Sequence, residues 1–320
     1  MRKLLAVTFL CTAAYAQLPG GSLWTDPGNI PALDFSGGVA APVDPPKPPF
    51  TFLREDMSGT QPKIFARDAS GATWNVKFGL EVRPESFCWR VVRACGYFAE
   101  PNFLVTSGKF EGFHPIARKD STLHADGTFT YGRFQYRDPN LKFLEDKNWR
   151  WDGPPFAGTK ELSGLKILIM LFSNWDNKDA RVGAAGGPNT AIFELKKPSG
   201  TKYIYTFTDW GDGFGRQATG VRANWQCAGF TQESAGFVQS VDKGLVSFNY
   251  NGNISAGFRT GIPVSHVAWF VNYLGRITDA QLRTGFKSSG ASDADASCFA
   301  AALRTRIEEL RSASAKGAVN

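Results

Sequence analysis

Residues 62–96, PKIFARDASGATWNVKFGLEVRPESFCWRVVRACG, determine the fold that this sequence predicts. Pro62–Ala66 and the alternating run Thr73–Phe78 flank an Asp-Ala-Ser-Gly turn, a pattern typical of a β-hairpin. Pro84 then stands where the first turn of a helix is expected, and apolar residues recur with helical spacing until a glycine ends the run. A further strand is expected over Tyr97–Val105. This order of strand, strand, helix and strand predicts a small β-rich unit.

Beyond this unit the chain is predicted to be mainly helical. Residues 159–172 are apolar on most sides, as in a helix that is buried within a larger unit. Two short β runs follow at 190–194 and 203–208, and helices are expected at 264–274, 279–286 and 296–310. We therefore predict an α+β architecture with two lobes. The parts are a small β-rich N-terminal lobe over residues 51–107, an irregular connecting segment over 108–158, and a mainly helical C-terminal lobe over 159–315.

The N-terminus has the three parts of a secretory signal peptide, assigned to residues 1–16. Arg2 and Lys3 supply the positive charge, an apolar run follows, and Ala14-Tyr15-Ala16 forms a small-x-small cleavage site. The apolar run is shorter than the roughly 20 residues that cross a bilayer. An exported protein in the periplasm or outside the cell is expected, with no transmembrane segment after cleavage. Residues 17–50 are rich in Pro and Gly and are predicted to be an extended leader or linker.

The charge of the chain gives no support to nucleic-acid binding. The formal net charge is +7, and removal of Arg2 and Lys3 with the signal peptide leaves 7 − 2 = +5. Because the surplus is spread along the chain without a basic run, a solvated surface is the better interpretation and no nucleic-acid partner is expected.

Four cysteines follow the signal peptide, and an even count in an exported chain permits disulfides. Cys88 and Cys95 lie in the predicted helix, where their spacing puts the Cα atoms about 10 Å apart, too far to bridge each other. Any disulfide is therefore expected to join one of them to Cys227 or Cys298. Four free thiols are the alternative. Without a Cys-x-x-Cys pair or a His/Cys cluster, a structural zinc site is not expected.

Two acidic loops are the sharpest candidates for chemistry. Residues 174–179, Asn-Trp-Asp-Asn-Lys-Asp, directly follow the buried helix, and residues 209–215, Asp-Trp-Gly-Asp-Gly-Phe-Gly, follow a β run some thirty residues later. Enzymes of phosphoryl transfer place a catalytic carboxylate and a magnesium ligand side by side on such loops. The alternative is a pair of surface loops, since Asp, Asn and Gly are common turn formers.

The hairpin carries the residues that would hold phosphate. Lys77 lies inside an apolar strand, and Glu85 at the start of the next helix, or Glu81, is placed to pair with it. The alternative is a solvent-facing Lys, with the Glu residue favouring the helix dipole. The small-residue turn Ser58–Lys63 leads into the first strand, and the backbone N–H groups of such a turn can wrap phosphates. An ordinary hairpin turn is the alternative.

These motifs resemble those of HipA-like kinases, relatives of the phosphatidylinositol 3/4-kinase group. The resemblance rests on Ser58-Gly59-Thr60-Gln61-Pro62-Lys63, on Val76-Lys77 with Glu85 and Arg93-Ala-Cys-Gly96, on Asn174-Trp175-Asp176, and on Asp209. It covers residues 57–215 as scattered motifs. The chain is also similar to exported bacterial proteins of unknown function that carry "NNWD" and "DLG..FG" segments.

The resemblance implies a two-lobed protein-kinase-like fold that binds ATP and Mg²⁺. Lys77 would contact the phosphates together with the turn residues Ser58, Gly59, Thr60 and Lys63, and Glu85 would orient Lys77. Asp176 would be the catalytic carboxylate, and Asp209 would bind magnesium. The phosphate acceptor would be a protein or a small molecule of unknown identity.

The sequence departs from the family pattern at one position. The family places Asn, the second metal ligand, five residues after the catalytic Asp, where this chain has Arg181. Arg is always charged and cannot ligate a metal, so Asp179 or Asn177 would have to substitute. This departure, with the scarcity of ATP outside the cytoplasm, motivates the alternative of an inactive pseudokinase that acts as a binding or scaffold protein in the cell envelope.

The remaining candidate residues point to ordinary structural roles. The three histidines, His114, His124 and His266, have no metal-pair or triad spacing. Trp149 and Trp151 are spaced to face one side of a strand. They would suit stacking on sugar rings, as in a carbohydrate-binding protein, but core packing is the better interpretation.

Overall fold

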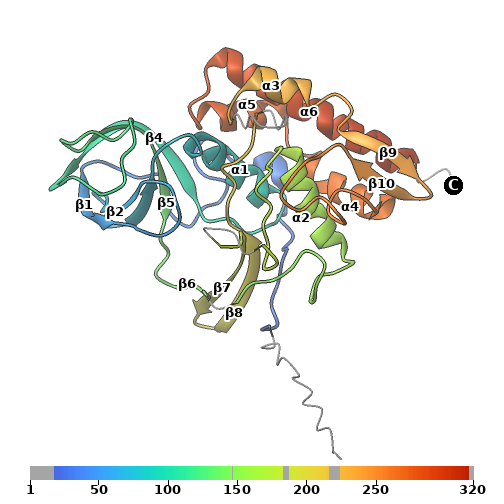
Figure 1. Cartoon of the computed structure of the whole chain (residues 1–320), viewed down its shortest axis with the longest axis horizontal. Helices are drawn as coiled ribbons and strands as arrows, with labels where there is room; N and C mark the ends of the chain where they lie inside the picture. Colours follow the sequence, from blue (N-terminus) through green and yellow to red (C-terminus); the bar gives the residue numbers. More distant parts are fainter. Residues whose placement is uncertain (1–17, 146, 183–186, 216–223, 317–320) are drawn as a thin grey trace, which may run out of the picture.

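A computed structural model describes residues 18–145, 147–182, 187–215 and 224–316 of the chain (Figure 1). The predicted signal peptide lies outside the described residues. The fold is α+β, as predicted. A closed five-stranded β-barrel and two small sheets are combined with helices that gather in the C-terminal region. None of the described helices is both long enough and apolar enough to cross a membrane.

The barrel has the strand order β1-β2-β3-β5-β4. Its strands are β1 (Phe50–Glu55), β2 (Lys63–Arg67), β3 (Thr73–Lys77), β4 (Asn102–Glu111) and β5 (Thr128–Tyr136). Neighbours are antiparallel except β1 and β4, whose short parallel pairing closes the barrel. Packed aromatic rings fill the interior, among them Phe50, Trp74, Phe110, Phe129 and Phe134. This rigid core fixes the end of β3, where Lys77 lies.

The hairpin and helix predicted from residues 62–96 are confirmed. β2 and β3 pair around Asp68, whose carboxylate accepts the backbone N–H groups of Ser70 and Ala72 within the turn. α1 (Val82–Ala94) begins a few residues after β3 and packs against β4 and β5 of the barrel as well as α4 and α5. Because the connection is short, the first turn of α1 lies beside the end of β3.

The segment 108–158 is not an irregular connection, contrary to the prediction. β4 starts at Asn102 and runs on to Glu111, and β5 and β6 (Leu141–Phe143) follow. β5 was missed because Arg133 interrupts its apolar alternation. That side chain is buried through an ion pair with Glu85, so a charged residue occupies an interior position of the strand.

The C-terminal region contains the predicted helices. α2 (Lys160–Leu171) is buried, with the Thr159 side chain as its N-cap, and α4 (Val264–Leu274), α5 (Asp279–Lys287) and α6 (Asp293–Lys316) match the expected positions. The two β runs form β7 (Thr190–Lys197) and β8 (Gly200–Phe207), which pair in the sheet β6-β7-β8. Not predicted were α3 (Cys227–Gln232) and a second sheet of β9 (Val238–Asp242), β10 (Leu245–Phe248) and β11 (Ile262–Pro263).

Residues 18–49 are not a detached leader or linker, which corrects the prediction for residues 17–50. Leu23, Ile30 and Phe35 are buried in the core, and a short 3₁₀ helix, η1, spans Ile30–Ala32. Irregular backbone can be buried only where other groups satisfy its polar atoms. Here Gln281 of α5 donates to the carbonyl oxygens of η1 and its flanks, and Arg90 of α1 donates to that of Phe35.

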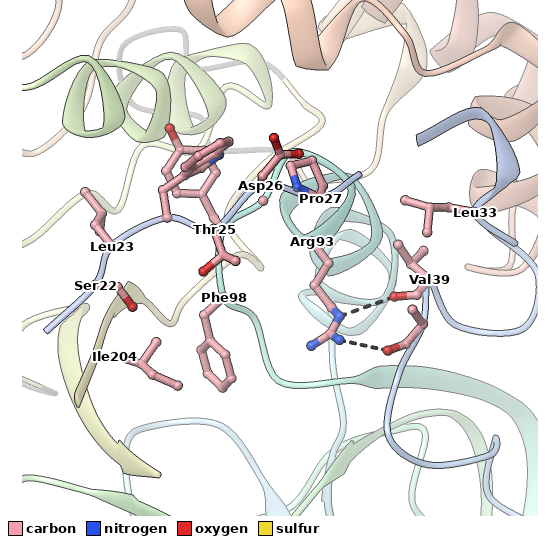
Figure 2. A pocket seen from close by; sticks show the side chains of 14 residues that line it. Ser22, Leu23, Thr25, Asp26, Pro27, Leu33, Val39, Arg93, Phe98 and Ile204 are labelled. Atoms are coloured by element: carbon pink, nitrogen blue, oxygen red, sulfur yellow. Dashed lines mark hydrogen bonds between the residues drawn. The ribbon is translucent and has the colours of Figure 1, made fainter. Parts of the chain in front are cut away.

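This N-terminal segment also closes a shallow cavity of about 290 Å³ against the end of α1 and β8. Figure 2 shows Ser22, Leu23 and Ile204 at the left of the view and Leu33 and Val39 at the right, with Arg93 between them. The Arg93 guanidinium donates to the carbonyl oxygens of Val39 and Ala40, and both residues have positive φ angles. The hydrogen bonds therefore hold a locally unfavourable backbone conformation in place.

The cysteine prediction is wrong. Cys227 at the start of α3 and Cys298 in α6 form a disulfide with each other, while Cys88 and Cys95 are free thiols. Cys88 in α1 and Cys95 directly after the helix are both fully buried, so neither reaches the α3–α6 contact. A disulfide of this kind is typical of an oxidising compartment. Trp149 and Trp151 are buried in the core, in agreement with the packing interpretation.

Candidate functional site

A polar cavity of about 410 Å³ lies where the barrel meets the loops that follow α2 and β8. From the barrel side it is lined by the turn between β1 and β2, the end of β3 and the start of α1. From the other side it is lined by the loop after α2 and the loop after β8. The lining residues are Gly59, Thr60, Gln61, Lys63, Lys77, Glu81, Trp175, Asp176, Lys178, Asn189, Asp209 and Asp212.

Lys77 is the central cation of this cavity. Its Nζ lies 2.5 Å from Glu85 Oε1 and also donates to the Glu81 carboxylate, so both partners considered from the sequence are used. Burial alone would lower the pKa of Lys77, but the two carboxylates outweigh it and raise that pKa above its usual value. Lys77 therefore stays protonated at every physiological pH. It is not the solvent-facing Lys of the alternative interpretation.

A second cation fixes Glu85 from the opposite side. Arg133 Nε of β5 lies 2.9 Å from Glu85 Oε2, and its guanidinium also donates to Asn102 Oδ1 at 2.8 Å. Burial opposes the charged form of Glu85, yet Arg133 and Lys77 together lower its pKa. Glu85 is thus an ionised carboxylate shared by two cations, and its position is determined by the barrel wall.

The loop after α2 brings Asp176 to the cavity. Arg306 of α6 donates to the carbonyl oxygens of Met170 and Leu171 at the end of α2, which fixes where the loop begins. Three donors then hold the Asp176 carboxylate: Lys178 Nζ at 2.9 Å, Asn189 Nδ2 at 3.0 Å, and the Asn253 amide. The carboxylate is thereby fully oriented.

Asp179 is not brought to the cavity, although it was predicted as a metal ligand. It is buried, and its Oδ2 accepts the backbone N–H of Trp151 at 2.9 Å. Arg181 makes an ion pair with Asp179 at 2.8 Å and with Asp152 at 2.8 Å. Asp179 and Arg181 therefore neutralise each other outside the group of residues that line the cavity.

The loop after β8 carries Asp209 and Asp212, and its glycines allow it to approach its neighbours closely. A Cβ atom at Gly211 would lie 2.5 Å from Glu81 Cβ, and one at Gly213 would lie 2.7 Å from the Phe172 carbonyl oxygen. The loop is also tied to residue 174, since Asn174 Nδ2 donates to the Asp209 carbonyl at 2.7 Å. These contacts bring the two acidic loops together.

The carboxylates of the cavity form an excess of negative charge. Oxygen atoms of Asp176, Asp209 and Asp212 lie within 4.8 Å of one another, and so do those of Glu81, Glu85 and Asp209. Burial and the neighbouring carboxylates raise the pKa of Asp209 to about 6, against the opposing effect of Lys77. Burial, Glu81 and Asp209 raise the pKa of Asp212 to about 8. Asp209 and Asp212 are thus held near other carboxylates, and the nearby cations do not fully balance the negative charge.

Of the residues predicted to bind phosphate from the turn before β2, three line the cavity and one does not. Gly59, Thr60 and Lys63 line the cavity. Ser58 does not line it, and its hydroxyl instead accepts a hydrogen bond from Lys63 Nζ at 3.1 Å. Burial lowers the pKa of Lys63, partly offset by Asp56.

Several residues of the site were not predicted. Asp212 had a visible signal, because it lies in the same Asp-Trp-Gly-Asp loop as Asp209. Asn189 and Asn253 had none, since they come from loops whose position depends on the whole fold.

Comparisons with known proteins give no further guidance. Neither a family model, nor a curated protein, nor a solved structure matches this chain.

Proposed function

We propose that this chain is an exported, kinase-like phosphotransferase that uses ATP and Mg²⁺ at the 410 Å³ cavity. The observation that carries the proposal is the convergence of Lys77 from the barrel with Asp176 and Asp209 from two distant loops. Phosphoryl transfer needs this combination of a fixed cation, an oriented carboxylate and metal-binding oxygens. The barrel with α1 would act as the small lobe of a two-lobed kinase-like fold, and the helical region would act as the large lobe.

The residues of the site fit a magnesium ion. Mg²⁺ binds carboxylate oxygens and neutralises the charge that raises the pKa values of Asp209 and Asp212. Asp209 and Asp212 would hold the ion, with Asp212 in the role for which the resemblance expects Asn at position 181. Because Arg181 lies in its own ion pairs, it does not block this arrangement. When bound, the ion would neutralise phosphate charge.

The remaining steps are assigned to side chains of the cavity. Lys77, permanently protonated, would donate to the phosphates, and Glu85 with Arg133 would keep it in position. The acceptor is a hydroxyl group of a protein or small molecule. Its oxygen forms a bond to the γ-phosphorus while the bond from that phosphorus to the bridging oxygen breaks and ADP leaves. Asp176 would take the hydroxyl proton, and Lys178, 2.9 Å from Asp176, would stabilise the charge of the transferred group.

A pseudokinase is the second candidate, and the surroundings of Asp176 favour it. Its carboxylate is already bound by Lys178, Asn189 and Asn253, so both of its oxygens are engaged before an acceptor hydroxyl arrives. In this alternative the cavity binds a nucleotide without transfer, and the protein acts as a binding or scaffold protein in the cell envelope. The Cys227–Cys298 disulfide supports an extracytoplasmic location for both candidates.

Substitution of the proposed metal ligand tests nucleotide binding. Asp209→Asn should weaken the binding of a non-hydrolysable ATP analogue in the presence of Mg²⁺ by at least about 10-fold, because the ion loses a charged ligand. The measurement is isothermal titration calorimetry, and the control is Asp242→Asn at an exposed position of β9. A wild-type protein that binds no nucleotide would contradict both candidates.

Transfer of labelled γ-phosphate to added acceptors, or to the protein itself, separates the two candidates. The transferase proposal expects transfer by the wild type and none by Asp176→Asn, with nucleotide affinity retained. Binding without any transfer by the wild type would favour the pseudokinase.

A further inference from the structure

The turn between β1 and β2 forms one wall of the cavity. Gly59, Thr60 and Gln61 line it, and Gly59 has a φ of +61°, a conformation that glycine adopts without strain. Lys63 and Lys77 line the same wall, so the turn lies beside two cations. The conformation of this turn therefore affects any anion that enters the cavity.

The Arg118 side chain donates hydrogen bonds to the carbonyl oxygens of this turn. Its Nη2 donates to the Met57 carbonyl at 2.7 Å, and its Nη1 donates to the carbonyls of Ser58 at 3.1 Å and Gln61 at 3.5 Å. Arg118 belongs to the excursion of residues 112–127 between β4 and β5, far from the turn in sequence. One guanidinium thus holds both ends of the turn.

The excursion is itself fixed to the base of the turn. The backbone N–H groups of Ala117 and Arg118 donate to the two carboxylate oxygens of Glu55, at 2.8 and 3.0 Å. Glu55 is the last residue of β1, directly before the turn. The Arg118 side chain therefore acts from a backbone whose position the barrel determines.

The carbonyl groups of the turn have a hydrogen-bond partner in Arg118, whereas most of its backbone N–H groups have none among the described residues. The Ser58 N–H donates to Asp56 at 3.0 Å. For the backbone N–H groups of Gly59, Thr60 and Gln61, by contrast, no acceptor is found anywhere in the described ranges of the chain. Three consecutive N–H donors at a cavity wall that also carries two lysines are suited to an anion with several oxygens, such as a phosphate.

We infer that Arg118 is a positioning residue that holds the turn of residues 57–61 as a cradle for the phosphate groups of the bound nucleotide. By occupying the carbonyl oxygens of the turn, it fixes the backbone in a conformation whose amide groups are left for the phosphate oxygens. The identity of the phosphate-bearing ligand rests on the proposed function, whereas the action of Arg118 on the turn does not.

An arginine is required for this role because of its shape. The guanidinium presents several N–H donors in a rigid fork, so it can hold carbonyl groups on residues 57, 58 and 61 together. A lysine has the same charge but a single nitrogen on a flexible stem. Arg118→Lys therefore separates the loss of geometry from the loss of charge.

The test compares Arg118→Lys and Arg118→Ala with the wild type and with Lys119→Ala, an exposed neighbouring cation, as the matched control. Calorimetric titration uses inorganic pyrophosphate, adenosine and an ATP analogue with Mg²⁺. Both Arg118 variants should bind pyrophosphate and the analogue about 5- to 20-fold more weakly, the loss expected when hydrogen bonds to a charged group are weakened. Adenosine binding and the melting temperature should be unchanged. Bound pyrophosphate should slow hydrogen exchange at the amides of residues 59–61 in the wild type, and should slow it less in both Arg118 variants.

Each of the other outcomes has a distinct meaning. Unchanged pyrophosphate affinity in both Arg118 variants, or a wild type that binds no pyrophosphate, would overturn the inference. Equal losses for adenosine and pyrophosphate with a lower melting temperature would also overturn it, because they would indicate a general structural role. If the wild type binds pyrophosphate but no nucleotide, the proposed function fails while the role of Arg118 is still judged by the variants.

Discussion

At the residue scale, Asp212 shows how the cavity keeps a carboxyl group protonated. Its pKa is raised to about 8 because burial, Glu81 and Asp209 all disfavour the carboxylate. In the unfolded chain an Asp ionises near its ordinary value of 3.8. Between these two values the folded protein keeps a proton that the unfolded chain releases, so stability falls as the pH rises from about 4 to about 8.

Replacement of Asp212 by a neutral residue should remove this pH dependence. Asp212→Asn keeps an oxygen to accept the hydrogen bond from Asn224 but carries no charge. The stability of the variant relative to the wild type should therefore increase from pH 5 to pH 8, by at most about 1.4 kcal/mol per pH unit for one proton. Urea denaturation in the presence of a chelator measures it, with Asp242→Asn as the control. A difference that stays constant across this range would contradict the assigned pKa.

Some residues of the site could be predicted from the sequence and others could not. Glu85 and Glu81 were both candidate partners of Lys77, beside the alternative of a solvent-facing Lys, because both carboxylates lie shortly after the strand that carries it. Arg133, Asn189 and Asn253 were not predicted. Arg133 and Asn253 act on residues far away in the chain, and Asn189 acts across the loop between α2 and β7, so only the folded barrel and loops bring these pairs together.

At the scale of elements, the loop after β8 takes its position because Gly211 and Gly213 have no side chain. Gly211 lies against Glu81 and Glu85 at the start of α1, and Gly213 lies against the end of α2. The loop therefore fits between the start of α1, which carries the partners of Lys77, and the end of α2, which leads into the Asp176 loop. The distance between the two acidic loops depends on this close packing.

Addition of a methyl group at this contact should separate the loop from α1. Gly211→Ala places a Cβ 2.5 Å from Glu81 Cβ, so the backbone must move, and such overpacking costs about 1–3 kcal/mol. We expect a lower melting temperature together with weaker binding of Mg²⁺ and the ATP analogue. The control is Gly20→Ala, where the added Cβ meets no atom within 4 Å. Wild-type affinity in Gly211→Ala would show that the loop is not held by this contact.

Helices were predicted more accurately than strands, for a physical reason. The periodicity of α4, α5 and α6 is local, so the sequence alone contains it. β5 lies between β3 and β4 in the barrel and carries a buried charge, so its identity depends on partners elsewhere in the chain. The α+β class was predictable, whereas the closure of the barrel through the pairing of β1 with β4 was not.

At the scale of the whole molecule, the N-terminal segment belongs to the core. It begins beside β8, where Ser22 pairs with Ile204, and passes α5, where Phe35 is only 1% exposed and close to Gly285. It reaches the barrel at Lys47, whose backbone N–H donates to Asp68. Its composition suggested a linker because Pro and Gly prevent regular structure. Composition does not show, however, that Arg90 and Gln281 satisfy its backbone.

Truncation of its main apolar side chain distinguishes a structural segment from a linker. Phe35→Ala should lower the free energy of unfolding by about 3–5 kcal/mol, as expected for a large aromatic residue removed from a core. Phe143→Ala, at a side chain that is 43% exposed, is the control and should cost much less. Denaturant titration of both variants gives the comparison. Equal, small effects would mean that the segment does not contribute to the folded core.

The Cys227–Cys298 disulfide protects the protein from losing a fragment when a protease cleaves it. It joins residues 71 positions apart, and β9, β10, β11, α4 and α5 all lie in the loop that it closes. If a protease cleaves the backbone anywhere inside this loop, the two fragments remain covalently joined, and α6 with Arg306 is retained against the end of α2. A single cut inside this loop therefore does not release a fragment, which is an advantage in surroundings where peptidases are abundant.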